Sequence, residues 1–450
     1  MPDHPNVIVF FTDQQRHDST GIHGNPLDLT PNFDRMATAG THVLHSFTCQ
    51  PVCGPARSCL QTGQYATQTG CWRNGIPLRP DARTLAHYFN EAGYRTGYIG
   101  KWHLADGKSP GPVRKEQRGG YDYWLGANAL EHTSDAYNAT VYDGEGREVK
   151  LPGYRVDGLT DAAIRYIDSH QREPFFLFLS FLEPHHQNHV DDYPPPDGYR
   201  DRYTGRWTPP DLAALGGSSQ QHLGGYWGMV KRLDEALGRL LDALKSLSLD
   251  QKTIVLFTSD HACHFKTRNA EYKRSCHESS IRVPTAICGP GFDGGGRIRQ
   301  LVSLLDLPPT LLDAAGIAVP PQMQGRSILP LLRGQSAGWP DDVYVQISEA
   351  QVGRAIRTSR WKYCVDAPDK HGGKDPASDH YVEQYLYDLQ HDPHELNNLI
   401  GLQSHRRVAE VLRARLLKRL AEAGEGPATI EPAPSRPSGQ RQVTEEEAHS

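Results

Sequence analysis

Short apolar runs that alternate with amphipathic stretches are the feature that most constrains how this chain can fold. Such runs predict buried strands at residues 7–11, 94–100, 175–182 and 253–258. Strands that are apolar on both faces are normally covered by helices on both sides and pair in parallel. We therefore expect an α/β fold built on a large, mostly parallel sheet sandwiched by helices.

The segments between these runs have a helical pattern. Residues 84–92 read as a helix that Gly93 ends, and residues 159–169 look helical as well. Five leucines fall on one helical face further along: Leu233, Leu237, Leu240, Leu241 and Leu244. Stretches rich in Gly and Pro at 107–120, 193–217 and 289–296 are expected to be long surface loops.

The character of the sequence changes after about Gly334. A short antiparallel sheet and a closing helix are predicted there, at residues 342–348, 354–358, 361–366 and 406–423. We expect an α/β domain at 1–335 and a smaller C-terminal α+β subdomain at 336–424. The last residues, 425–450, are rich in Pro, Glu and Ser, which predicts a disordered tail.

Composition excludes several classes of protein. Hydrophobic residues make up 37% of the 450 residues and charged residues 22%, as in soluble globular proteins. The net charge of −5 argues against a nucleic-acid partner, and no apolar run approaches the roughly 18 residues of a membrane span. The N-terminus reads MPDHPN without a basic leader, so we expect a cytoplasmic protein. Eight cysteines are too few for a disulfide framework, and free thiols are expected.

Polar side chains follow the four predicted strands at the points where the strands end. In an open α/β sheet, ligands bind outside the carboxyl ends of the strands. The residues at these ends are Asp13 and Gln14, Lys101 and His103, His185 and His186, and Asp260 and His261. One polar strand end alone would be unremarkable, but four together predict a reactive edge of the sheet.

Four of these residues offer ligands for a divalent cation. Asp13, Gln14, Asp260 and His261 together make a mixed oxygen and nitrogen cage. The alternative is that the two aspartates cap neighbouring helices, which aspartate side chains do readily.

Cys53 lies at the start of a predicted helix. Pro55 suits the first turn, so the Cys53 side chain would sit at the positive N-terminal end, where a thiolate or a bound anion is stabilised. Arg57 follows one helical turn later and can hold a negative group beside it. The alternative is a buried thiol at a helix start.

The motif Cys-x-Pro-x-Arg at Cys53–Arg57, followed by Leu60, Thr62 and Gly63, resembles the signature of the formylglycine-dependent sulfatases of the alkaline phosphatase superfamily. The resemblance extends over nearly the whole chain. Further similar segments are Thr12-Asp13-Gln14, Gly100-Lys101-Trp102-His103, Pro184-His185, Ser259-Asp260-His261, Lys273 with Glu278, Arg282, Val283 and Pro284, and Leu386-Tyr387-Asp388-Leu389 with Asp392-Pro393.

The resemblance implies an alkaline-phosphatase-like fold and a sulfuric ester hydrolase. A maturation enzyme would convert Cys53 to formylglycine, whose hydrate, activated by one divalent metal, would attack sulfur and form a covalent sulfo-enzyme. Calcium is the first choice for that metal and manganese the alternative. Cys53 itself is expected beside the metal, together with Asp13, Gln14, Asp260 and His261.

Roles for the remaining residues follow from charge. Arg57, Lys101 and Lys273 would supply the positive charge that an anionic ester needs. His185 or Lys273 would protonate the leaving alcohol, and His103 would take the proton from the second hydroxyl. The substrate is expected to be a small-molecule or oligosaccharide sulfate ester, with carbohydrate favoured. Substrate contacts are expected from His186, His264, Arg268 and Asn269.

Two departures from the family pattern keep an alternative open. Many sulfatases have two adjacent carboxylates after the first strand, where this chain has Asp13-Gln14, and Ala262 stands where glycine is usual. The same Asp-Gln and Asp-His set resembles the phosphonate monoester and phosphodiester hydrolases, which also use formylglycine. A non-catalytic carbohydrate-binding relative would be expected to lose Cys53, Arg57 or a metal ligand, and all of them are present.

Overall fold

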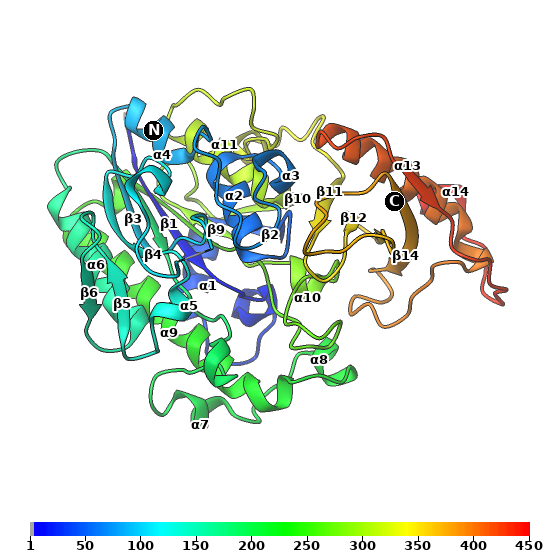
Figure 1. Ribbon diagram of the computed structural model, residues 1–450, viewed down its shortest axis with the longest axis horizontal. Coiled ribbons are helices and arrows are strands. Elements are labelled where there is room, and N and C mark those ends of the chain that lie inside the picture. The colour runs from blue at the N-terminus through cyan, green and yellow to red at the C-terminus, as the bar shows by residue number, and fades with distance from the viewer. Residues whose placement is uncertain (1–3, 108) are drawn as a thin grey trace.

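A computed structural model describes residues 4–107 and 109–450 of the chain. Within these residues one sheet has ten strands in the order β10-β2-β9-β8-β1-β7-β3-β4-β5-β6 (Figure 1). Their bounds are β1 Asn6–Thr12, β2 Thr41–Phe47, β3 Arg95–Lys101, β4 Tyr123–Ala127, β5 Ala139–Tyr142, β6 Glu148–Leu151, β7 Phe175–Ser180, β8 Thr253–Ser259, β9 Ala286–Cys288 and β10 Gly296–Ser303.

The centre of this sheet confirms the predicted parallel arrangement. β1 pairs in parallel with β7 and β8, and β3 pairs in parallel with β7 and β4. The sheet as a whole is mixed, because β9 runs antiparallel to both of its neighbours and β5 and β6 form an antiparallel edge. The strands of the antiparallel edge lie in a segment that the sequence did not assign.

Helices cover both faces of the large sheet. Across the described residues the helices are α1 Pro31–Ala39, α2 Cys53–Thr62, α3 Ala66–Thr69, α4 Leu85–Glu91, α5 Leu130–Thr133, α6 Arg155–Ser169, α7 Tyr199–Tyr203, α8 Pro210–Ala214, α9 Ser219–Ser246, α10 Glu278–Ile281, α11 Leu307–Ala314, α12 Leu329–Leu332, α13 Arg406–Glu422 and α14 Glu445–Ala448. The predicted helices correspond to α4, α6, α9 and α13.

Alternation along β1 shows how the two faces differ. Val7, Val9 and Phe11 pack in one apolar core with α2, α4 and α11, whereas Ile8 and Phe10 pack in the other with α1, α6 and α9. Every residue of β1 is buried, which explains the unbroken apolar run in the sequence. Of the expected loops, 193–217 contains α7 and α8, and 107–120 is described except at residue 108.

A second sheet lies beside the first in the C-terminal part of the chain (Figure 1, yellow to red). Its order is β11-β12-β13-β14-β15, with bounds β11 Asp342–Ile347, β12 Gly353–Thr358, β13 Trp361–Asp366, β14 His380–Asp388 and β15 Thr429–Glu431. The first four strands are antiparallel, and α13 packs against β12 and β13.

The prediction of a disordered tail at 425–450 is wrong. β15 adds to the sheet in parallel with β14, and α14 buries Ala448 against the C-terminal core. The start of the tail is ordered because the Arg354 guanidinium forms a buried ion pair with Glu425 at 2.7 Å. Near the end, the Trp361 indole donates to the Glu447 carbonyl at 2.7 Å.

In the described ranges no helix is long and apolar enough to cross a bilayer.

Candidate active site

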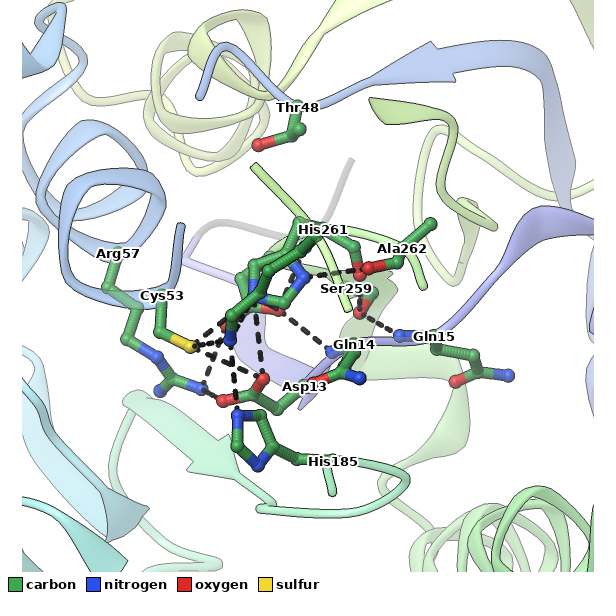
Figure 2. A network of polar contacts seen from close by, with 12 residues as sticks. Asp13, Gln14, Gln15, Thr48, Cys53, Arg57, His185, Ser259, His261 and Ala262 are labelled. Atoms are coloured by element: carbon green, nitrogen blue, oxygen red, sulfur yellow. Dashed lines mark hydrogen bonds and ion pairs between the residues drawn. The ribbon is translucent and has the colours of Figure 1, made fainter. Parts of the chain in front are cut away.

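The residues predicted at the strand ends meet at one edge of the large sheet. β8, β1, β7 and β3 are neighbours in that order, and their carboxyl ends present Asp260, Asp13, His185 and Lys101. Helix α2 begins at Cys53 and brings the thiol over this edge. Figure 2 shows the Cys53 sulfur, the Asp13 carboxylate and the His261 ring turned toward one another.

The Cys53 sulfur is the centre of the cluster. Lys273 Nζ donates to Cys53 Sγ at 2.8 Å, and His261 Nε2 lies 3.3 Å from the same atom. Asp13 Oδ1 is 3.6 Å from Cys53 Sγ. Lys273 also reaches His185 Nε2 at 3.1 Å, so one ammonium links the thiol to the histidine after β7.

Arg57 and Lys101 hold the carboxylates from the other side. Arg57 Nη2 lies 2.8 Å from Asp13 Oδ2 and 3.3 Å from Asp260 Oδ2, and Lys101 Nζ lies 2.8 Å from Asp13 Oδ2. Arg57 Nη1 donates to the Ser180 hydroxyl at 2.7 Å and to the Lys101 carbonyl at 2.8 Å. All these side chains are almost fully buried, so their charges are poorly screened by water.

This concentration of charge shifts the pKa values of the thiol and the carboxylates. Burial alone would raise the pKa of Cys53, but Lys101, Lys273 and His261 hold it well below its ordinary value. The pKa of Asp13 is lowered because Lys101, His185 and Arg57 outweigh its burial and the repulsion from Cys53. Burial and the charge of Asp13 raise the pKa of Asp260 to about 6. Asp13 and Asp260 therefore face each other without enough positive charge to ionise both easily.

A divalent cation fits this site for that reason. One ligand atom from each of Asp13, Cys53, Asp260 and His261 lies within 4.8 Å of the others. Gln14 adds an amide whose nitrogen donates to the Tyr193 hydroxyl at 3.0 Å and to Cys263 Sγ at 3.2 Å. Its carbonyl oxygen is the atom left for a metal. The alternative that the aspartates serve as helix caps has no support, since neither Asp13 nor Asp260 precedes a helix.

A cavity of about 230 Å³ opens beside Cys53. Gln14, His103, His185 and His186, from the predicted strand ends, line it together with Lys273. His103, two residues after β3, has a positive φ of 61°, and its Nδ1 lies 4.0 Å from Glu131 Oε1. Of the two neighbouring histidines, His185 faces Lys273, whereas His186 Nε2 contacts Asp191 Oδ1 at 2.9 Å.

Three residues expected to contact substrate need correction. His264 is fully buried, and its Nε2 bonds to the Lys273 carbonyl at 2.9 Å. Asn269 donates to that same carbonyl at 3.0 Å. Arg268 donates to the His394 and Glu395 carbonyls and lines a different cavity of about 290 Å³. These side chains shape the loop that carries Lys273 and do not line the cavity beside Cys53.

Several residues of the cavity wall carry no motif and were missed. Glu131 is buried with Oε2 3.2 Å from Lys101 Nζ. Burial would raise the pKa of Glu131, but Lys101 and His103 lower it to about 2, so it is a carboxylate. Tyr272, Asn74 and Arg274 also line the cavity. Tyr272 and Arg274 flank Lys273 in the sequence, and this position was the only signal that could have found them.

The C-terminal sheet contributes to the same wall. Glu349, two residues after β11, lies 2.5 Å from Arg274 Nη2 and accepts a hydrogen bond from the Asn74 backbone N–H at 2.7 Å. The Asn74 side chain in turn accepts from the Gly54 N–H at 2.9 Å, next to Cys53. The Gln50 amide donates to the Ser348 hydroxyl at 2.7 Å. Both units of the chain therefore support the loop before α2.

A buried thiol at a helix N-terminus, a carboxylate pair suited to a metal, and the cations Arg57, Lys101 and Lys273 beside them suit a hydrolase for anionic esters. The family model described as Sulfatase matches residues 5–317, and one described as N-sulphoglucosamine sulphohydrolase, C-terminal, matches residues 271–422. The chain belongs to the sulfatase family and is a sulfuric ester hydrolase.

Individual relatives agree with this family. The chain is 29% identical over 443 residues to an ulvan-active sulfatase of Formosa agariphila, covering 94% of this chain and 82% of the relative. A solved structure from work on glycosaminoglycan metabolism by Bacteroides thetaiotaomicron superposes with a TM-score of 0.81 at 25% identity, covering 94% and 97%. The phosphonate monoester hydrolase of Agrobacterium radiobacter shares the fold, with a TM-score of 0.72 at 23% identity, covering 93% and 96%.

Proposed function

We propose that this sulfatase hydrolyses a sulfate ester on a carbohydrate after Cys53 is converted to formylglycine, with one divalent metal bound beside it. The proposal rests on the environment of Cys53 Sγ. This atom lies 3.6 Å from the carboxylate of Asp13, a candidate metal ligand, and 2.8 Å from Lys273 Nζ. The sulfur marks the position that the oxygens of a hydrated aldehyde would take. A maturation enzyme that oxidises Cys53 is the partner this requires.

The metal would be held by Asp13, Gln14, Asp260 and His261. When bound, the metal would act as a Lewis acid, and the hydrated aldehyde would supply the attacking hydroxyl. Two carboxylates, one amide and one imidazole are a softer set than the all-oxygen cage that calcium prefers. Calcium remains the family expectation and manganese the alternative, which titration of metal-free protein with each ion would separate.

The chain's own residues do the remaining work. Arg57 and Lys101 fix Asp13 so that its second oxygen faces Cys53. Lys273 contacts both the reacting position and His185, so we assign it to protonate the leaving alcohol. Burial and the charge of Lys273 lower the pKa of His185, which keeps its ring neutral and suited to orient the ammonium. His103, beside Glu131, is placed to take the proton of the second hydroxyl.

A sulfated carbohydrate suits the cavity better than an apolar ester. Its wall offers amide, imidazole, carboxylate and ammonium groups, which can pair with sugar hydroxyls. The ulvan-active relative and the neighbour studied in glycosaminoglycan metabolism support the same substrate class.

Hydrolysis of phosphonate monoesters or phosphodiesters is the second candidate function. Gln14 favours it, because an amide in place of a carboxylate leaves the centre less negative. Comparison of 4-nitrophenyl sulfate with a phenyl phosphonate ester, with calcium or manganese, decides between the two. Far faster turnover of the phosphonate would overturn the sulfatase preference.

The formylglycine proposal has a direct test. Peptide mass spectrometry of active protein should find formylglycine at position 53, and Cys53→Ala should be inactive although correctly folded. Full activity in protein that carries only unmodified cysteine at this position would refute the mechanism.

A further inference from the structure

A second cluster of metal-type ligands lies next to the proposed machinery. It is formed by His186, Asp191 and His222, which come from the loop after β7, the end of the short helix Asn188–Val190, and the first turns of α9. One nitrogen from each imidazole and one carboxylate oxygen lie within 4.8 Å of one another.

We propose that His186, Asp191 and His222 bind Zn²⁺ at the wall of the substrate cavity, separately from the metal centre beside Cys53. Two imidazoles and one carboxylate are a zinc-type ligand set that leaves a fourth position open. Calcium and magnesium prefer oxygen ligands and are disfavoured by the two nitrogens.

The distances are close to those that zinc requires. Ligands about 2.0–2.1 Å from a tetrahedral zinc lie roughly 3.3 Å apart. His186 Nε2 and Asp191 Oδ1 are 2.9 Å apart. All three ligand atoms lie within 4.8 Å of one another, so the His222 nitrogen would have to move inward by at most roughly 1.5 Å. The Asp191 side chain, 65% exposed, is free to adjust.

An unsatisfied nitrogen of His222 points to a missing ligand. His186 and His222 are 4% and 1% exposed. Among the described residues, His222 Nδ1 has no hydrogen-bond partner, and the nearest carboxylate to it is Asp192 Oδ1 at 3.7 Å. A buried imidazole nitrogen without a partner costs free energy that a bound cation would remove.

The protonation states of the three ligands suit a cation as well. Burial lowers the pKa of His186 to about 4 and also lowers that of His222, so both rings offer lone pairs near neutral pH. A hydrogen bond from the Tyr272 hydroxyl lowers the pKa of Asp191, which is therefore ionised. Ligands that are already deprotonated bind a metal without releasing protons.

Zinc at this position would act through Tyr272 on the loop that carries Lys273. The Tyr272 hydroxyl lies 3.0 Å from His186 Nε2 and donates to Asp191 Oδ1 at 2.9 Å. Tyr272 directly precedes Lys273, and His186 directly follows His185. A bound zinc would thus fix the two segments that supply the proposed proton donor and its partner.

Calorimetric titration of the full-length, calcium-loaded protein with Zn²⁺ tests the proposal. We expect one zinc ion per chain. Residues that only hydrogen-bond to a metal ligand change affinity by about 10–100-fold, so His222→Ala, which removes a ligand, should weaken binding by more than roughly 100-fold. Asp191→Asn should weaken it too. His189→Ala, on the same loop but paired with Asp135, is the matched control and should bind as the wild type does.

Two further arms keep the result unambiguous. Zinc should raise the melting temperature of the wild type and the control but not of His222→Ala or Asp191→Asn; the second variant changes an exposed side chain and carries the test if the first does not fold. Cys53→Ala should retain the zinc. Absence of zinc binding, equal binding by the ligand variants, or loss of zinc in Cys53→Ala would each overturn the proposal.

Discussion

Replacement of Arg57 by lysine tests whether the guanidinium, and not merely its charge, organises the site. The Arg57 guanidinium donates to Asp13, Asp260, Ser180 and the Lys101 carbonyl at distances between 2.7 and 3.3 Å. A lysine ammonium is a point charge on a single stem and cannot span both carboxylates and the two neutral acceptors. We expect it to keep a hydrogen bond to one carboxylate and to leave the Ser180 hydroxyl oxygen without a donor, whereas the Lys101 carbonyl still accepts from the Tyr98 and Ser180 hydroxyls.

The expected size of the effect follows from the hydrogen bonds that lysine cannot form. A hydrogen bond to a charged group contributes about 1.5–3 kcal/mol, and a buried acceptor left without a donor costs about 1–3 kcal/mol. Arg57→Lys should therefore lower stability by about 3 kcal/mol. If the same interactions are lost from the transition state, kcat/KM for 4-nitrophenyl sulfate should fall by about 100-fold.

Ser180→Ala is the control, because it removes one neutral partner of Arg57 and leaves the hydrogen bonds to both carboxylates. It should lose about 1 kcal/mol and little activity. Urea unfolding and steady-state kinetics measure the two quantities, and mass spectrometry of the Cys53 peptide corrects each rate for the fraction converted. Wild-type rates in fully converted Arg57→Lys, or equal losses in both variants, would refute this account of Arg57.

Three further changes have defined outcomes. Gly100→Ala should prevent folding or lower the melting temperature strongly, because φ is +107° and a Cβ would overlap a backbone carbonyl oxygen of β7; a normal melting curve would contradict this. Burial and two nearby arginines lower the pKa of His42 to about 4, so its ring stays neutral in the folded protein. The contribution of this neutral ring to folding stability is therefore fully present above pH 6.5 and is lost as the pH falls toward 4. Between pH 7.5 and pH 5.5, the free energy of unfolding measured in urea should therefore fall by about 1 kcal/mol less in His42→Gln than in the wild type. Deletion of residues 437–450 should cost about 2 kcal/mol by uncovering Trp361, as thermal unfolding would show, and unchanged stability would mean that the tail does not pack.

The sequence predicted the central fold and the charged centre because both follow local rules. Strands buried on both faces have unbroken apolar runs, and a parallel sheet brings the residues after those runs together. Asp13, Lys101, His185 and Asp260 could be found in this way. A helix start and one helical turn fix the relative position of Cys53 and Arg57, but it was the resemblance of their motif to the sulfatase signature that identified them.

What the sequence did not reveal depends on interactions between distant segments. Glu131 faces Lys101 only because α5 follows β4 at the same edge, and the short β4 carried no clear pattern. His264 was expected in the cavity, but its ring turns toward a backbone carbonyl, and no local signal sets that direction. The tail has the composition of a disordered segment, yet the pair of Arg354 and Glu425 joins it to the second sheet.

The connection from Glu349 through Asn74 to Gly54 has a consequence for engineering this enzyme. Gly54, next to Cys53, is held by the Asn74 side chain, and the Asn74 backbone is held by Glu349 of the C-terminal unit. A chimera that exchanges that unit for one from another sulfatase would also remove this support from the residue next to Cys53. An exchanged C-terminal unit should therefore keep a carboxylate at the position of Glu349.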